Sequence, residues 1–172
     1  MRATPNKGNH WILYIKDHFS KYSFLYALHD TTAIGVANCI AQWLDIVGIP
    51  GILHCNNGAE FKGVFLILLK KYGIKIITGR PRCPQMQGLV EQANGVMKVK
   101  LRCWLADHES QGWSDALADI ALEMNRQSHS SLRGKMLYEI FFIRKPRWED
   151  RVAVGADVQV DQIEYEALGD QV

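Results

Sequence analysis

The stretch Ile52-Leu-His-Cys-Asn-Asn-Gly-Ala-Glu-Phe61, followed by Pro84-Gln-Met-Gln-Gly-Leu-Val-Glu91, decides the fold of this chain. The first segment is a short apolar run that ends in a polar turn, a pattern typical of a buried strand. The second segment is loop-like and leads into a helix whose first turn carries a carboxylate. A strand end and a helix start can bring two side chains to one point. Here those side chains are Asn56 and Glu91.

The elements around this stretch alternate in a way that predicts an α/β fold. Apolar runs predict strands at 11–15, 23–28, 52–54 and 74–77. Helical spacing predicts helices at 33–47, 59–72, 89–108 and 114–128 and a short one at 136–143, whereas 78–88 reads as a loop and 4–8 as a turn. Thr31 or Thr32 can cap the first helix, and Gly48 and Pro50 end it.

The two quoted segments resemble the catalytic core of retroviral and gypsy-class retrotransposon integrases. That family carries (T/S)-D-N-G-x-x-F followed by P-Q-x-Q-G-x-x-E, and this chain has Cys55–Phe61 and Pro84–Glu91 in the same order and spacing. The segment 129–146 is similar to the closing motif of the family, although Ile143 stands where Gly is usual. The resemblance implies a ribonuclease H-like integrase core, with a mixed sheet and helices on both faces, over residues 1–150. Residues 151–172 then form an acidic, mobile tail.

The resemblance also implies an interruption in the sheet. The first strand of such a core lies in the middle of the sheet and carries the first catalytic aspartate. We expect most of that strand to lie upstream of Met1, so that residues 1–4 are its last residues. Two open strand edges would then lower the stability of residues 1–172 or promote their association.

The catalytic carboxylates of the family are incomplete in this sequence. Such enzymes hold two Mg²⁺ or Mn²⁺ ions with three carboxylates, because hard cations prefer charged oxygen ligands. Asn56 occupies the second acid position and Glu91 the third, which leaves Glu91 as a weak residual metal ligand. Asp17 is a candidate substitute, but a role in capping the corner at 17–21 is favoured. We therefore expect no strand transfer.

The residues expected to contact nucleic acid surround Glu91. Lys98 and Arg102 follow Glu91 by seven and eleven positions, which keeps them near one helix face. Phosphate contact and a salt-bridged solvent face are equally consistent with that spacing. The other expected contacts are Asn57, Arg80, Arg82, Gln85 and Gln87.

Composition fits an anionic partner outside the secretory pathway. All 20 basic residues but only 13 of the 18 acidic residues lie in 1–151, which gives this part a formal charge of +7. The four cysteines have no C-x-x-C spacing, so neither zinc binding nor a disulfide framework is indicated. Because no apolar run reaches about 18 residues, we expect a soluble nuclear or cytoplasmic protein that binds DNA and no membrane.

The sequence is consistent with three functions. The first is an integrase-derived, retrotransposon-related module that binds nucleic acid without catalysis, a pseudoenzyme. The second is an active DNA integrase whose missing acids come from upstream sequence or from a partner chain, and Asn56 argues against it. The third is a dimerisation module, because cores of this family pair through their helices.

Overall fold

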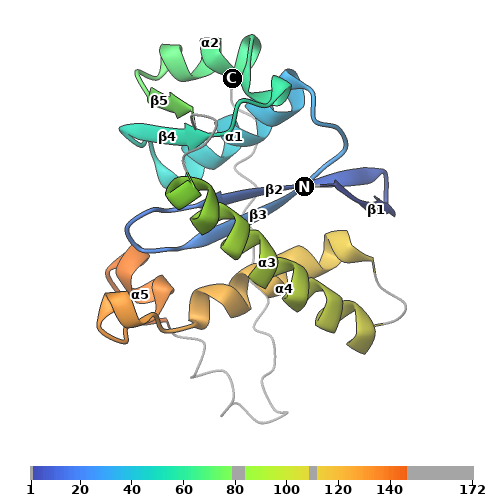
Figure 1. The fold of residues 1–172 in the computed structure, drawn as a ribbon, viewed down its shortest axis with the longest axis vertical. Helices are drawn as coiled ribbons and strands as arrows, with labels where there is room; N and C mark the ends of the chain where they lie inside the picture. Colours follow the sequence, from blue (N-terminus) through green and yellow to red (C-terminus); the bar gives the residue numbers. More distant parts are fainter. Residues whose placement is uncertain (1, 79–83, 109–111, 147–172) are drawn as a thin grey trace, which may run out of the picture.

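The computed structural model describes residues 2–78, 84–108 and 112–146. Their strands form two sheets (Figure 1). An antiparallel sheet has the order β1-β2-β3, with β1 at Arg2–Asn6, β2 at Asn9–Lys16 and β3 at Ser23–Leu28. A parallel pair joins β4 (Ile52–Cys55) to β5 (Lys75–Thr78).

Five α-helices surround these strands in the described part of the chain. They are α1 (Ala33–Val47), α2 (Val64–Lys71), α3 (Pro84–Asp107), α4 (Trp113–Arg126) and α5 (Leu137–Phe142), with 3-10 turns at Ala59–Phe61 and Ser130–Leu132. The predicted N-cap of α1 is confirmed, because the Thr32 hydroxyl accepts a hydrogen bond of 3.0 Å from the Gly35 N–H. In Figure 1, α1 and α2 lie with β4 and β5 on one side of the three-stranded sheet, and α3 and α4 cover the other side.

Two hydrophobic cores hold these layers together. In the first, α1 and α2 pack against strands of both sheets. Its buried members include Val36, Ile40, Phe65 and Leu69. The second core lies between the three-stranded sheet and helices α3 and α4. It is built around Ile12, Met97 and Ile120. Because α1 contacts both sheets, the molecule has one continuous α/β body.

The sheet is interrupted between β2 and β4, as predicted. Within the described residues the three-stranded and two-stranded sheets share the α1 core, but no backbone ladder joins them. The predicted α/β fold is therefore present with its strands in two separate sets. The turn predicted over 4–8 was wrong in its first half, because β1 extends to Asn6 and only Lys7 and Gly8 have the positive φ of a tight turn.

Two helix boundaries also differ from the prediction. The predicted helix 59–72 is broken at Gly63, whose φ of +55° is a conformation that glycine adopts at little cost. Val64, the first residue of α2, is 46% exposed. The loop predicted over 78–88 is helical from Pro84, because the fixed φ of proline suits the first position of a helix.

One departure from the family pattern lies at the end of α5. Ile143 ends this helix with a φ of +54° and is 91% exposed. Left-handed backbone is unfavourable for a β-branched residue and easy for the glycine that is usual at this position. The chain therefore keeps the helix-ending conformation without the residue that suits it.

Candidate functional site

The turn after β4 positions Asn56, the residue at the second acid position of the motif. β4 ends at Cys55, and the Asn56 Oδ1 atom accepts a hydrogen bond of 2.9 Å from the Gly58 N–H. This is the local turn that Asn and Asp side chains make with the backbone two residues on. Asn56 and Asn57 are both exposed at this strand end. The Asn56 side-chain oxygen therefore stabilises its own turn.

The candidate substitute acid, Asp17, lies at the end of β2. Its Oδ2 atom accepts two hydrogen bonds of 2.6 Å, from the backbone N–H and from the hydroxyl of Ser20. The Asp17 backbone N–H also donates to the Tyr22 carbonyl at 2.8 Å, which closes the corner between β2 and β3. The prediction that Asp17 caps this corner is confirmed.

These side-chain oxygens do not fit the pair of divalent ions that the resemblance implies. Asn56 is neutral and bonded to its own turn, whereas Asp17 is committed to Ser20. β1 has the sequence Arg-Ala-Thr-Pro-Asn and supplies no carboxylate. No cluster of three His, Cys, Asp or Glu side chains suited to a metal ion occurs among the described residues. Two dications need more negative charge than this set provides.

The third acid position, Glu91, lies inside α3. The sequence predicted Glu91 in the first turn of its helix. Since α3 begins at Pro84, Glu91 is instead the eighth residue of the helix. At this depth the Glu91 carboxylate gains little from the helix dipole, because that effect is confined to the first turn. Gln85 and Gln87 are also on α3, but these three side chains lie outside the described part of the structure, as do Arg80 and Arg82 entirely.

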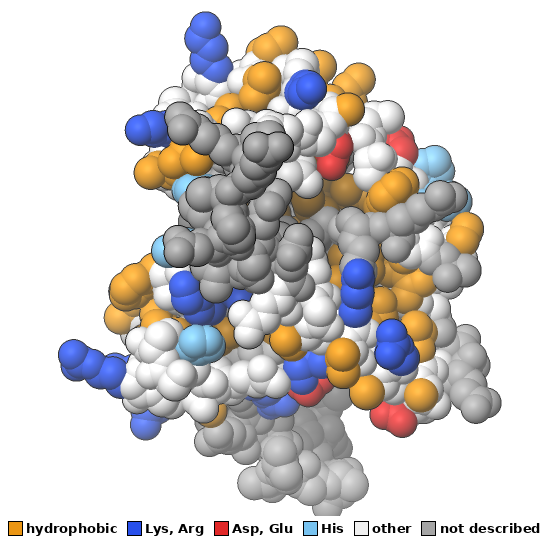
Figure 2. All heavy atoms as spheres, viewed as in Figure 1, with side chains coloured by type: hydrophobic (Ala, Val, Ile, Leu, Met, Phe, Trp, Pro, Cys, Tyr) orange, Lys and Arg blue, Asp and Glu red, His pale blue; other side chains and the backbone are white. Residues whose placement is uncertain are grey.

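Further along α3 lie Lys98 and Arg102, the two residues predicted to contact phosphate. Lys98 and Arg102 are exposed, and neither side chain forms an ion pair or a hydrogen bond with another residue that the structure describes. Lys100, between them, pairs instead with Glu123 of α4. The sequence was consistent with either phosphate contact or a salt-bridged face. The salt-bridged side of the helix is the side that carries Lys100. In Figure 2, Lys and Arg side chains are spread over the face that α3 and α4 form, with few acidic ones.

A buried polar network beside β3 was not predicted. The Asn125 side chain, 2% exposed, accepts a hydrogen bond of 2.8 Å from the Ser23 N–H and donates one of 2.8 Å to the Ser23 carbonyl. The Ser23 hydroxyl lies 2.9 Å from the Tyr14 hydroxyl. Burial raises the pKa of Tyr14, although this hydrogen bond opposes the shift. The network joins α4 to β3 and β2.

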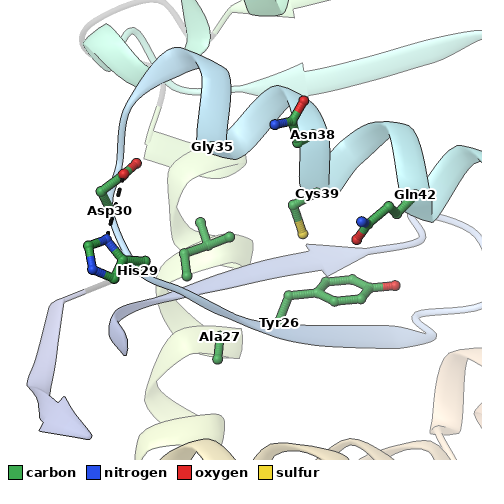
Figure 3. Close-up of a pocket in the computed structure, with 9 residues that line it drawn as sticks. Tyr26, Ala27, His29, Asp30, Gly35, Asn38, Cys39 and Gln42 are labelled. Atoms are coloured by element: carbon green, nitrogen blue, oxygen red, sulfur yellow. Dashed lines mark ion pairs between the residues drawn. The ribbon is translucent and has the colours of Figure 1, made fainter. Parts of the chain in front are cut away.

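A shallow pocket of about 310 Å³ lies between β3 and α1 (Figure 3), and it too was missed. Cys39 and Gln42 of α1 face Tyr26 of β3 across it, and the His29 imidazole lies 3.8 Å from the Asp30 carboxylate at one end. Burial raises the pKa of the Cys39 thiol to about 11, so that it stays protonated and is a poor nucleophile at neutral pH. None of the motif residues lines this pocket.

The fold and the motif together define the class. No family profile matches the chain, but its fold is that of a ribonuclease H-like integrase catalytic core. The catalytic core domain of bovine immunodeficiency virus (BIV) integrase matches with a TM-score of 0.65 at 28% identity, over 77% of this chain and 85% of that one. An HTLV-2 integrase core solved in complex with magnesium matches with a TM-score of 0.63 at 22% identity, over 76% and 91%.

Relatives in sequence agree with this class, which confirms the predicted resemblance. Human KRAB-A domain-containing protein 2 is 27% identical over 135 residues, covering 77% of this chain and 27% of that protein. The Gag-Pol polyprotein of BIV is 34% identical over 113 residues, 65% of this chain and 7% of the polyprotein. The chain thus spans about a quarter or less of these relatives. Among the described helices, none combines the length and hydrophobicity needed to cross a bilayer.

Proposed function

We propose that this chain is an integrase-core-like domain that binds DNA but does not transfer strands. The observation that carries the proposal is the turn after β4. There a neutral amide, bonded to the Gly58 N–H, occupies the position where metal chemistry requires a carboxylate. Glu91 and Asn56 are the degenerate remains of the acid set, and Mg²⁺ or Mn²⁺ binds only weakly.

The DNA-binding part of the proposal is supported by α3. Lys98 and Arg102 are exposed and without a described carboxylate partner, so they can neutralise phosphates without first breaking an ion pair. Residues 1–151 have a formal charge of +7, which favours association with a polyanion. The motif amides Asn57, Gln85 and Gln87, together with Arg80 and Arg82, complete the proposed contact surface. The proposal places the protein in the nucleus or the cytoplasm.

Binding to duplex DNA at several salt concentrations tests this surface. Each phosphate contact contributes about 1 to the slope of log K against log salt, so Lys98→Ala with Arg102→Ala should reduce the slope by about 2. Lys70→Ala with Lys75→Ala is the matched control. It removes the same charge from exposed positions of α2 and β5, and it should leave the slope closer to that of the original chain.

Equal losses in both double variants would mean that net charge alone drives binding. No salt-dependent binding by the original chain would contradict the proposal and favour a dimerisation module. That module is a third possibility because an HTLV-2 integrase core has been solved in a dimeric form. Sedimentation of the chain without DNA separates the two.

A further inference from the structure

The corner between β2 and β3 and the end of α5 form one surface that the proposed function does not use. Tyr22, which follows the corner, stacks on Phe141 of α5 with the ring centroids 4.6 Å apart. It also meets Phe142 edge-on at 5.4 Å, and Figure 1 shows the corner beside α5. We name this region the corner surface. Its members, of which only Lys21 is partly buried, are Phe19, Lys21, Phe142, Ile143, Arg144 and Lys145.

Large apolar side chains are exposed on the corner surface. Phe19 is 76% exposed, Phe142 43% and Ile143 91%. The hydrogen bonds of the corner fix the backbone around Phe19, and contacts with two tyrosine rings hold the ring of Phe142. Exposed rings on a rigid frame offer faces on which a flat, apolar group can stack.

Cations surround these apolar side chains. The Arg144 Nη2 atom donates a hydrogen bond of 3.1 Å to the Tyr138 hydroxyl, and the guanidinium carbon lies 5.8 Å from the centroid of the Phe142 ring. Lys21 and Lys145 add two further charges, and none of the three cations forms an ion pair with a residue that the structure describes. In Figure 2, Lys and Arg side chains lie beside hydrophobic ones over the region of α5 and the corner.

The carboxylates of these two segments are occupied by hydrogen bonds. Asp17 is bonded within the corner, and Glu139 accepts a hydrogen bond of 3.1 Å from the Met136 N–H at the start of α5. Partial burial and, to a smaller extent, the charge of Lys21 lower the pKa of Lys16. Like charges therefore repel one another at the base of the corner, and a bound anion would relieve that repulsion.

We propose that the corner surface binds single-stranded nucleic acid. Unpaired bases stack on the exposed rings of Phe19 and Phe142, and the three cations contact phosphates. A duplex fits less well, because its base faces are already stacked inside the helix. An acidic peptide would satisfy the cations but leave the rings without a flat partner. The corner surface shares no residue with the proposed duplex surface on α3, so the two proposals can fail separately.

The test measures binding of the complete chain to a labelled oligothymidylate of about ten nucleotides, and to a duplex of the same length, by fluorescence anisotropy. Phe19→Ala should weaken oligothymidylate binding by about tenfold, the loss of one base–aromatic stack, and leave duplex binding unchanged. Phe19→Tyr keeps an aromatic face and should bind like the original chain. Ile46→Ala, at a position of α1 that is 77% exposed, is the matched control and should change neither affinity.

Salt dependence tests the cations separately. Arg144→Gln with Lys145→Gln should reduce the slope of log K against log salt by about 1.4 for oligothymidylate, because each phosphate contact of a single strand contributes about 0.7. The double variant Lys98→Ala with Arg102→Ala should leave this slope unchanged. Thermal melting of every variant confirms that it is folded before its affinity is compared.

Three results would overturn the proposal. The first is an original chain that has no measurable affinity for oligothymidylate. The second is a Phe19→Leu variant that binds oligothymidylate as well as the original chain, which would mean apolar adsorption without stacking. The third is binding to vesicles of anionic lipid that is tighter than binding to oligothymidylate and is lost with Phe19→Ala, which would make a membrane surface the occupant.

Discussion

The corner between β2 and β3 and the turn after β4 both end a strand with a polar side chain bonded to the backbone, yet they differ in depth. In the corner, Ser20 and Ser23 are each 1% exposed, and Asp17 and Asn125 each make two hydrogen bonds. The turn at Asn56 is exposed and has one such bond. The corner thus contributes to the stability of the fold, whereas the stability of the fold depends little on which residue occupies position 56.

The largest expected effect is in the corner network. Asn125→Ala should lower the free energy of unfolding by about 2–4 kcal/mol, because the Ser23 N–H and C=O both lose their buried partner and each unsatisfied group costs about 1–3 kcal/mol. Urea denaturation measures this loss. Asn38→Ala, at an exposed position of α1, is the matched control and should change stability by less than about 0.5 kcal/mol. Equal effects of the two substitutions would break the comparison.

A smaller loss is expected at Asp17. Asp17→Ala removes the acceptor of two hydrogen bonds from Ser20 and should cost about 1–2 kcal/mol in the same denaturation experiment. Asp45→Ala, on the exposed side of α1, provides the control for the loss of a carboxylate. If Asp17→Ala were neutral, the corner would not depend on its carboxylate and the metal-ligand alternative for Asp17 would regain weight.

The smallest expected effect is at the turn after β4. Asn56→Asp should change the free energy of unfolding by less than about 0.5 kcal/mol, because an aspartate oxygen can accept the same hydrogen bond from the Gly58 N–H. We also expect no strand transfer from this variant with Mg²⁺ or Mn²⁺, since the candidate third carboxylate, Asp17, is bonded to Ser20. Measurable joining of DNA ends by Asn56→Asp would show that another group completes the site.

The contrast between these regions also explains what the sequence could predict. Short apolar runs bounded by Gly, Pro and polar residues predicted the strands from β2 to β5, and the spacing of the motif predicted where Asn56 lies. The Asn125–Ser23 network spans 102 positions, and no local pattern announces such a contact. The helix start at Pro84 was missed because glutamine and glycine beside a proline read equally well as a loop. The sequence spacing predicted one face for Lys98 and Arg102. The ion pair of Lys100 with Glu123 could not be predicted, because it depends on how α4 packs against α3.

Nicking of supercoiled DNA in the presence of Mn²⁺, by the original chain and by Glu91→Gln, tests the central claim most directly. Of the two acid positions in the motif, 56 and 91, only position 91 carries a carboxylate, so any metal-dependent cleavage by this site requires Glu91. We expect that both proteins bind DNA and that neither nicks it above the level seen with EDTA. Nicking by the original chain that Glu91→Gln abolishes would contradict the account and show an active metal site despite Asn56.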